Sequence, residues 1–431
     1  MRRIYLILLS FIVLSSFSNL CAQTNLEVEY RPRTEFREGF RKPMPDTLQP
    51  SFITLQRTRF NADYKGKIIN ARISLQDARI WGNSDTKTNS SKIEINEAWF
   101  EYLMTSGLSV QMGRQALKYD DLRLFSSPNW SNTGTSHDVA LLKFNCPFVT
   151  IHTGFAYNNS KDTLVNTAYA YTPKQSYKTL AYTWITKRLS EELNLSMIIV
   201  GDGFEAKTNP KMVYGRLTYG GNLVYSNDSS NLSFILTAYK QQGIDPNKTA
   251  GKSFAKLDAL FLAAKLSYKI MDKFIPAIGI DYYSGSASDI DATKSRTFNR
   301  LYGAPHVFNG YMEYFSSLPT QGLIDYYYNL TYQINSKIYA EMAGHNFNLE
   351  KDLMYKDEKK SKKLGSEIDF TLKYNASKDI SFQIGYSIFF NTSSTLIYYK
   401  MPDVKVHNQQ WAYLMIAIKP QLYKTPPIEN K

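Results

Sequence analysis

The sequence predicts an all-β protein: a transmembrane antiparallel β-barrel of 18 strands that stands in a bacterial outer membrane. Three observations predict it. Apolar and polar residues alternate along many short segments, short connections alternate with long ones, and aromatic residues make up 14% of the chain, with 32 Tyr and 24 Phe. Aromatic girdles at both membrane interfaces are typical of such barrels.

A two-residue period is the main structural signal in the chain. In residues 368–374 every second side chain is apolar, from Ile368 to Tyr374, which places these side chains on one face of a strand. Residues 381–388 repeat the pattern, and the 3.6-residue period of a helix occurs nowhere at comparable strength. Strands are therefore expected almost throughout.

The connections between the predicted strands have two very different lengths. Short ones such as Lys65-Gly66 and Asn335-Ser336 alternate with loops such as 118–136. Short turns at the periplasmic end and long extracellular loops are typical of an outer-membrane barrel. A count of 16 strands stays open, because boundaries read from sequence vary by several residues. The predicted strands are 25–37, 51–64, 67–81, 93–104, 108–117, 137–145, 148–158, 177–189, 193–203, 212–225, 231–242, 254–270, 274–284, 322–334, 337–348, 364–375, 380–392 and 409–421.

The N-terminus predicts a secretory signal peptide. A basic start precedes an apolar stretch, and we expect cleavage after Ala22 to remove residues 1–22. A lipoprotein anchored through Cys21 is the alternative, although the bulky Leu20 stands where a small residue is wanted. An N-terminal spanning helix is disfavoured because the apolar run is shorter than the roughly 20 residues that a bilayer requires.

Composition limits the cross-links and the partners. Once Cys21 leaves with the signal peptide, only Cys146 remains, so no intramolecular disulfide is expected. The formal net charge of +13 falls to +11 when Arg2 and Arg3 are removed. This charge suits an anionic partner, although composition alone does not separate polysaccharide, lipopolysaccharide and nucleic acid. For a membrane barrel we expect no nucleic-acid partner.

The alternation also sorts side chains into a lipid-facing set and a lumen-facing set. Arg31 and Arg33 share one strand face with several glutamates, and Arg57, Arg59 and Arg72 share faces with other polar residues. An arginine at the bilayer midplane costs about 2–4 kcal/mol, so these faces are expected to line the lumen.

Arginine is concentrated in the first third of the chain. Ten of the 14 arginines that follow the signal peptide lie between Arg31 and Arg123, whereas lysine is scattered, with one run at Lys359–Lys363 in a predicted outer loop. Arginine binds carboxylates through a planar fork, so the cluster indicates an anionic solute. The alternative is that arginines and carboxylates neutralise one another and stiffen the wall.

Five segments resemble the alginate-export family of outer-membrane porins. The most specific runs from Gly113-Arg114-Gln115 through Asp120 and the Arg123-Leu124 pair to the Trp130-Ser131-Asn132 loop, and the likeness covers nearly the whole mature chain. The five segments are 113–124, 130–133, 30–35, 298–311 and 364–369.

The resemblance implies an 18-stranded barrel whose electropositive channel passes an anionic, alginate-like polysaccharide outward. It also implies that Arg114 and Arg123 join the lumen set, with Asp120 as their partner. It leaves the substrate open, because porins of this type can pass other uronates or oligosaccharides.

Two other hypotheses for the function of the barrel stay open. A general or sugar-specific diffusion porin that imports small nutrients would share every feature except directionality. A structural or adhesion barrel would act through its outer loops, and residues 285–321 are long enough for a lid or a partner-binding surface. A one-sided row of arginines argues against pure adhesion.

No enzyme, cofactor or metal site is expected. The five histidines, His137, His152, His306, His345 and His407, show no metal-binding spacing. Residues 246–253 resemble a phosphate-binding loop, but Pro246 replaces its first glycine and the strand-to-helix context is missing. We interpret each histidine as a wall or rim residue.

The barrel is expected to occupy residues 23–423, with a short periplasmic tail at 424–431. Pro426 and Pro427 stop the strand ladder there, after a last strand that ends near the aromatic Tyr423. Outer-membrane lipid and the barrel-assembly machinery are the expected partners besides the saccharide.

Overall fold

The computed structural model describes residues 22–83, 93–165, 169, 176–206, 209–250 and 253–426. Residues 1–21 of the expected signal peptide (1–22) lie outside the described residues, as does the end of the expected tail at 427–431. The described chain is almost entirely antiparallel β-sheet, and this sheet closes into a barrel.

Eighteen long strands form the barrel wall, which confirms the predicted count and excludes 16. They are β1 (Gln23–Glu38), β2 (Ser51–Lys65), β3 (Ile69–Ile80), β4 (Glu94–Leu103), β5 (Leu108–Gln115), β6 (His137–Cys146), β7 (Val149–Tyr157), β8 (Thr179–Arg188), β9 (Leu193–Ala206), β10 (Asn209–Asn227), β11 (Leu232–Ala250), β12 (Ser253–Tyr268), β13 (Phe274–Tyr283), β15 (Leu323–Gln333), β16 (Ile338–Asn348), β19 (Lys363–Asn375), β20 (Ile380–Asn391) and β21 (Gln409–Ile418).

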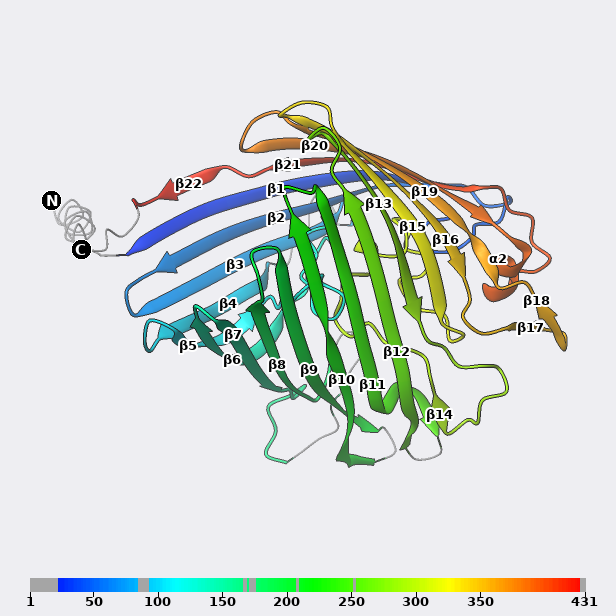
Figure 1. Cartoon of the computed structure of the whole chain (residues 1–431), viewed down its shortest axis with the longest axis horizontal. Coiled ribbons are helices and arrows are strands. Elements are labelled where there is room, and N and C mark those ends of the chain that lie inside the picture. The colour runs from blue at the N-terminus through cyan, green and yellow to red at the C-terminus, as the bar shows by residue number, and fades with distance from the viewer. Residues whose placement is uncertain are drawn as a thin grey trace.

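The first and last strands close the barrel. β1 pairs with β2 on one side and with β21 on the other, and β22 (Gln421–Lys424) continues β21 along β1. Pro420 separates β21 from β22, because proline has no N–H to donate to the ladder. β1 begins and β22 ends at the same end of the barrel (Figure 1), which we take as the periplasmic end because the short turns lie there.

The opposite end carries the long loops and the small elements within them (Figure 1). These elements are β14 (Lys294–Ser295), η1 (Pro305–Val307), the hairpin of β17 (Leu353–Tyr355) with β18 (Glu358–Lys360), and α2 (Ser393–Tyr398). Thr392 caps α2 by accepting a hydrogen bond from the Thr395 N–H at 3.2 Å. Within the described residues, no helix is both long enough and apolar enough to cross a membrane.

Two expected outer loops are instead extended hairpins. β9 and β10 stay paired as far as Ala206 and Asn209, and β11 and β12 as far as Ala250 and Ser253. The described part of the segment that resembles a phosphate-binding loop, residues 246–250 and 253, therefore lies in β11 and β12 rather than before a helix. The ladder absorbs the extra length through irregularities of register, one of them after Asp245.

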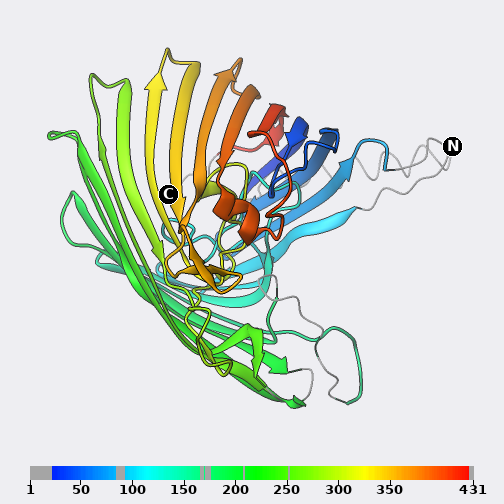
Figure 2. The ribbon, with the colours of Figure 1, turned by 90° about the vertical axis from the view of Figure 1, so that its right-hand side faces the viewer.

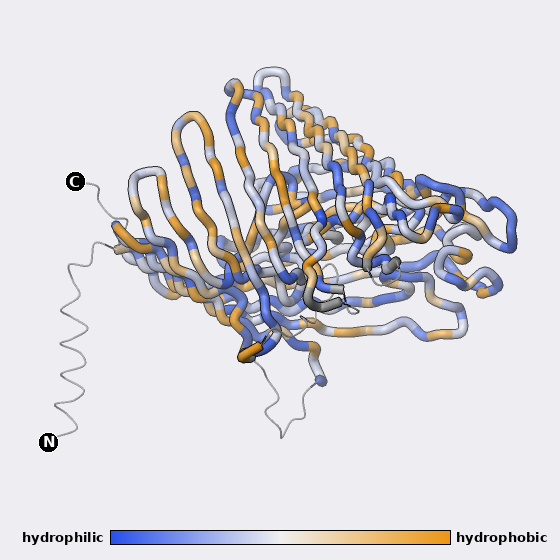
Figure 3. The backbone as a smooth tube through the Cα atoms, turned by 90° about the horizontal axis from the view of Figure 1, so that it is seen from below, coloured by the Kyte–Doolittle hydropathy of each residue, from blue (hydrophilic) through white to orange (hydrophobic). Residues whose placement is uncertain are grey.

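The two faces of the wall differ as the alternation predicts. On β19, Glu367 and Asp369 are 0% exposed, whereas Phe370 and Tyr374 are 44% and 40% exposed. Apolar and polar positions alternate along the strands in Figure 3. The apolar face therefore turns outward to lipid and the polar face inward.

Two long loops fold into the barrel instead of standing above it. We call residues 116–136 loop A and residues 284–322 loop B. Their backbones pair: the Tyr302 N–H donates to the Leu124 carbonyl at 2.9 Å, and Phe125 forms a parallel bridge with Tyr302. Phe125 is 0% exposed. In Figure 2 the loops lie within the ring of strands, with α2 at its outer opening.

Candidate functional site

Four arginines face the lumen side by side, as the sequence predicts: Arg31 and Arg33 on β1, and Arg57 and Arg59 on β2. We call them the arginine cluster. Arg31 lies directly opposite Arg57 in the ladder between the two strands. Arg31, Arg33 and Arg57 are 2%, 6% and 0% exposed. Charged groups so deeply buried require polar partners.

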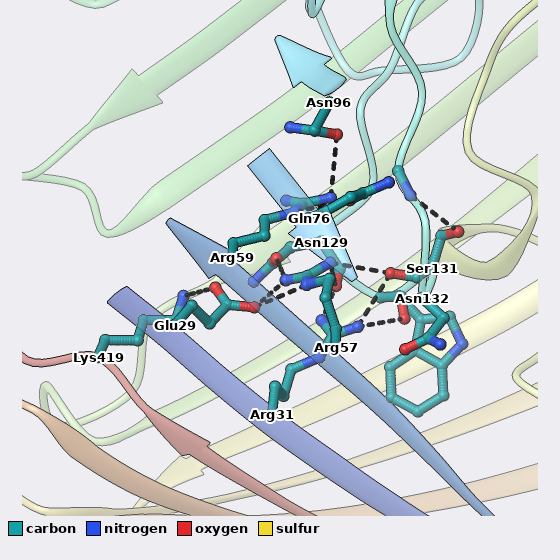
Figure 4. A network of polar contacts seen from close by, with 12 residues as sticks. Glu29, Arg31, Arg57, Arg59, Gln76, Asn96, Asn129, Ser131, Asn132 and Lys419 are labelled. Atoms are coloured by element: carbon teal, nitrogen blue, oxygen red, sulfur yellow. Dashed lines mark hydrogen bonds and ion pairs between the residues drawn. The ribbon is translucent and has the colours of Figure 1, made fainter. Parts of the chain in front are cut away.

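The arginine cluster binds the backbone of loop A, and Figure 4 shows three of its members, Arg31, Arg57 and Arg59. Each of its members donates at least one hydrogen bond to a carbonyl oxygen of residues 129–133. These bonds include Arg31 Nη2 to Ser131 (2.9 Å), Arg33 Nη1 to Trp130 (2.7 Å), Arg57 Nη1 to Ser131 (3.0 Å) and Arg59 Nη2 to Thr133 (2.9 Å). Hydrogen bonds to charged groups contribute about 1.5–3 kcal/mol each, so the cluster fixes loop A firmly to β1 and β2.

Carboxylates neutralise only part of the arginine cluster. Arg57 forms an ion pair with Glu29, and Arg33 Nε lies 2.8 Å from Oε1 of Glu35. Arg31 and Arg59 have no carboxylate within ion-pair distance among the described residues. Their guanidinium groups bind only carbonyl and amide oxygens, so the cluster keeps an excess of positive charge.

Arg72 on β3 also faces the lumen, as predicted, but nearer the periplasmic end. Its Nη1 lies 2.7 Å from Asp63 and its Nε 3.2 Å from Glu97, and the side chain is 27% exposed. Two carboxylates therefore hold Arg72 in place while part of its guanidinium stays accessible.

The prediction that Arg114 lines the lumen is wrong. Arg114 pairs with Asp138 at 3.1 Å, and the two side chains are 42% and 64% exposed. They lie opposite each other in the ladder between β5 and β6, on the outward face that Met112 shares. The two-residue period continues through Gly113, which takes the inward position. At this outer rim a charge costs little, unlike at the bilayer midplane.

Arg123 lies inside the barrel, as the resemblance implies, and it binds the opposite wall. Its Nη1 and Nη2 donate to Asp281 on β13 at 2.6 and 2.8 Å, and its Nε donates to Asp121 at 2.9 Å. The guanidinium also lies over the Phe308 ring, 3.9 Å from its centroid. Loop A is therefore fixed at a second point, far from the arginine cluster.

Asp120 lies inside the barrel, but its expected pairing with Arg114 or Arg123 is wrong. It accepts a hydrogen bond from Nε1 of Trp184 at 2.8 Å, and its neighbour Asp121 takes the place beside Arg123. Burial raises the pKa of Asp120 above its usual range, against the hydrogen bonds that lower it.

Loop B is held by carboxylates that the sequence reasoning missed. The Met312 N–H donates to Glu367 at 2.7 Å, and the Tyr311 N–H donates to Asp369 at 3.4 Å. Asn309 donates to Asp325 at 3.0 Å. The signal was present, because Glu367 and Asp369 occupy the polar positions of the alternation that identified β19.

Loops A and B also touch through aromatic rings. The Trp130 ring stacks on His306 with centroids 4.1 Å apart, and Tyr311 lies on the other side at 5.2 Å. His306 Nδ1 lies 3.2 Å from Glu313. Burial lowers the pKa of His306, although Glu313 acts in the opposite direction. The neutral form of His306 is therefore favoured in this stack.

Three cavities lie along the lumen, on either side of loops A and B. The outer cavity, about 610 Å³, includes Arg41, Arg300 and Glu313 in its lining. The middle cavity, about 450 Å³, lies on the periplasmic side of the loops and includes Lys265 and Glu341. The mouth cavity, about 420 Å³, lies at the periplasmic end and is lined in part by Lys65, Arg72, Trp99 and Lys424.

The histidines take hydrogen-bonding positions in the wall and loops. His137 and His152 lie 3.0 and 3.2 Å from tyrosine hydroxyls, and His345 lies 2.9 Å from Asp325. His407 is exposed, 3.4 Å from Asp46. Among the described residues, no group of three or more His, Cys, Asp or Glu side chains could hold a metal ion.

Comparison with known proteins identifies one family. A family model described as alginate export matches residues 22–392. None of the curated proteins matches the sequence.

Solved structures of outer-membrane proteins share the fold. OccAB1 of Acinetobacter baumannii has 12% identity and a TM-score of 0.60, covering 93% of this chain and 97% of its own. OpdK of Pseudomonas aeruginosa, solved with vanillate, has 10% identity and a TM-score of 0.61, covering 93% and 98%. OccK3 of the same organism has 13% identity and a TM-score of 0.60, covering 93% and 96%.

Proposed function

The chain belongs to the alginate export family and is a porin of the bacterial outer membrane, and from this premise we propose that it passes anionic saccharides, such as uronate polymers or oligomers, through its lumen. The members of this family are transport channels rather than enzymes.

The observation that carries the proposal is the excess positive charge of the arginine cluster. Arg31 and Arg59 face the lumen without a carboxylate partner among the described residues. Charges at a low-dielectric wall focus their field into the adjacent channel and attract oppositely charged solutes. Because oxygens of loop A and of the wall occupy most of their hydrogen-bond donors, these arginines act at a distance, which favours attraction without tight binding.

A second candidate is a diffusion porin that takes up small carboxylates or neutral sugars. The similar OpdK structure was solved with vanillate, a small carboxylate. The middle cavity, at about 450 Å³, has the size of a site for one small ligand. A third reading, adhesion through outer loops, is disfavoured because loop B folds into the lumen.

Two further partners belong to the proposal. Outer-membrane lipid would contact the outward aromatic side chains, among them Phe370 and Tyr374. The barrel-assembly machinery would meet the chain at its last strand, β22, where Tyr423 is 52% exposed.

Single-channel recording in a planar bilayer tests the proposal. We expect an anion-selective reversal potential in a salt gradient, and block by oligouronates at concentrations lower than those of neutral oligosaccharides. Arg59→Gln is expected to reduce the anion selectivity, whereas Arg188→Gln, at an exposed periplasmic turn, is not. Equal block by charged and neutral sugars would instead support the diffusion porin.

A further inference from the structure

The mouth cavity differs from the other two cavities in its charge. Lys65, Arg72 and Lys424 line it against a single carboxylate, Asp63. The middle cavity has the opposite balance, since its carboxylates, among them Glu341, outnumber its lysine and arginine side chains. Of the three cavities, the mouth cavity therefore has the most positive lining.

The cations of the mouth cavity are available to a ligand. Lys65 and Lys424 are exposed, and neither has an ion-pair partner in the part of the chain that the structure describes. Both face inward, because Lys65 lies opposite Gln23 and Lys424 opposite Asn25 in the ladders of β1. Two ammonium groups thus flank the opening from strands on either side of β1.

Trp99 supplies an apolar surface within the same cavity. It lies opposite Arg72 in the ladder between β3 and β4, which places it on the lumen face. Its Nε1 donates to Glu97 at 3.2 Å, which fixes the orientation of the indole. No other aromatic ring stacks on it among the described residues. A fixed, unstacked indole can pack against the C–H face of a sugar ring.

Amide groups complete the lining. Gln421 donates to Asn25, and this leaves the Asn25 amide to donate and a Gln421 oxygen to accept. Gln23 also lines the cavity. Amides in these positions can exchange hydrogen bonds with sugar hydroxyls.

We propose that the mouth cavity is a binding site for acidic saccharide units at the periplasmic end of the channel. Lys65 and Lys424 bind the carboxylate, and Trp99 packs against the sugar ring. Arg72, held between Asp63 and Glu97, forms the inner edge of the site. The site rests on the proposed function, namely that the channel carries anionic saccharides.

The charge of the next cavity explains how such a site avoids trapping its ligand. A saccharide that moves from the mouth into the middle cavity meets Glu341 and Asp325, the second of which also binds loop B. Transport requires binding that is strong enough to capture and weak enough to release. Binding of the acidic saccharide is then confined to the mouth cavity at the periplasmic opening.

The test is one-sided block of oriented single channels by a uronic-acid oligomer. We expect Lys65→Gln/Lys424→Gln to raise the half-blocking concentration from the periplasmic side about five- to tenfold, and the block from the outer side to change less than twofold. Trp99→Ala should also weaken periplasmic block by the oligomer while leaving inorganic ion selectivity unchanged, and Trp99→Phe should restore most of the block.

Matched controls separate a local site from overall charge. Lys273→Gln/Lys337→Gln removes two exposed lysines from periplasmic turns away from the cavity, and we expect no change in block. An equal shift in this control would overturn the site. If the wild-type channel is blocked but none of the cavity variants differs from it, the site is wrong and the channel function stands. If the oligomer blocks the wild-type channel from neither side, the proposed function and the site both fail.

Discussion

Residues 129–133 of loop A and residues 309–312 of loop B lie inside the barrel, yet the wall holds these two segments by opposite charges. Guanidinium groups of β1 and β2 bind the backbone carbonyls of loop A, whereas carboxylates of β15 and β19 bind N–H groups of loop B. A guanidinium stays charged at any pH at which the barrel works, but a carboxylate does not. The two loops should therefore respond differently to mutation and to acid.

The largest effect is expected at the arginine cluster. Arg57→Ala leaves Glu29 with Lys419 alone and leaves the Ser131 carbonyl with Arg31 as its only arginine donor, which should lower the free energy of unfolding by roughly 3 kcal/mol. Denaturant unfolding measures this, and limited proteolysis should show cleavage in residues 129–133. Arg188→Ala is the control at an exposed turn. Unchanged protection of loop A in the variant would contradict its anchoring by Arg57.

A smaller effect is expected where a carboxylate holds loop B. Glu367→Ala leaves the Met312 N–H without its acceptor, at a cost of about 1–3 kcal/mol. Hydrogen exchange of amides near Met312 should become faster while loop A stays protected. Glu367→Gln keeps an acceptor oxygen and should exchange as the wild type does. Similar exchange in all three proteins would mean that Glu367 does not anchor the loop.

Acid should loosen loop B but not residues 129–133 of loop A, which guanidinium groups hold. Burial lowers the pKa of His306, and His306 and Arg41 outweigh burial to hold the pKa of Glu313 below its usual range. Both shifts are depressions, so each contributes stability that is fully present above the unfolded-state pKa and is lost as the pH falls.

The loss should begin below about pH 6.5 for His306 and below about pH 4.3 for Glu313. Hydrogen exchange as a function of pH, corrected for the intrinsic rate, would measure it in residues 306–313. Replacing His306 with Gln should remove the first step. Faster exchange of residues 129–133 in the same pH range would contradict the distinction between guanidinium and carboxylate anchors.

The smallest effect is expected at the outer rim. Arg114→Ala removes an exposed ion pair with Asp138, which should cost less than about 1 kcal/mol and leave ion selectivity unchanged. Reversal potentials measured beside Arg59→Gln provide the comparison. A clear loss of anion preference in Arg114→Ala would instead indicate that Arg114 faces the lumen.

Period-two alternation was enough to predict the wall of the molecule. It identified all 18 strands and predicted that Arg31, Arg57 and Arg72 face the lumen, because successive side chains of a barrel strand point alternately to lipid and to lumen. Arg114 was misplaced because Gly113 was expected to interrupt the alternation, so that only a family likeness placed Arg114; in the structure the ladder continues through Gly113 at an inward position.

The contents of the lumen were not predictable in the same way. The arginine cluster binds backbone carbonyls, and every residue has one, so no sequence pattern marks the partners in loop A. Asp120 and Asp121 are adjacent acids, and only the left-handed backbone at Asp120 (φ 52°) decides which of them meets Arg123. The anchors Glu367 and Asp369 occupy polar positions of the alternation, but the alternation does not distinguish an anchor from any other lumen-facing side chain.

The two attachments of loop A connect two separate parts of the barrel wall. Residues 129–133 are fixed to β1 and β2, and Arg123 is fixed to Asp281 on β13. Five strands, β15, β16, β19, β20 and β21, separate β13 from β1 around the wall. Lateral pressure from the membrane tends to flatten a wide barrel, and a cross-brace resists this by transmitting force between distant strands. Loop A should therefore keep the cross-section round as membrane tension changes.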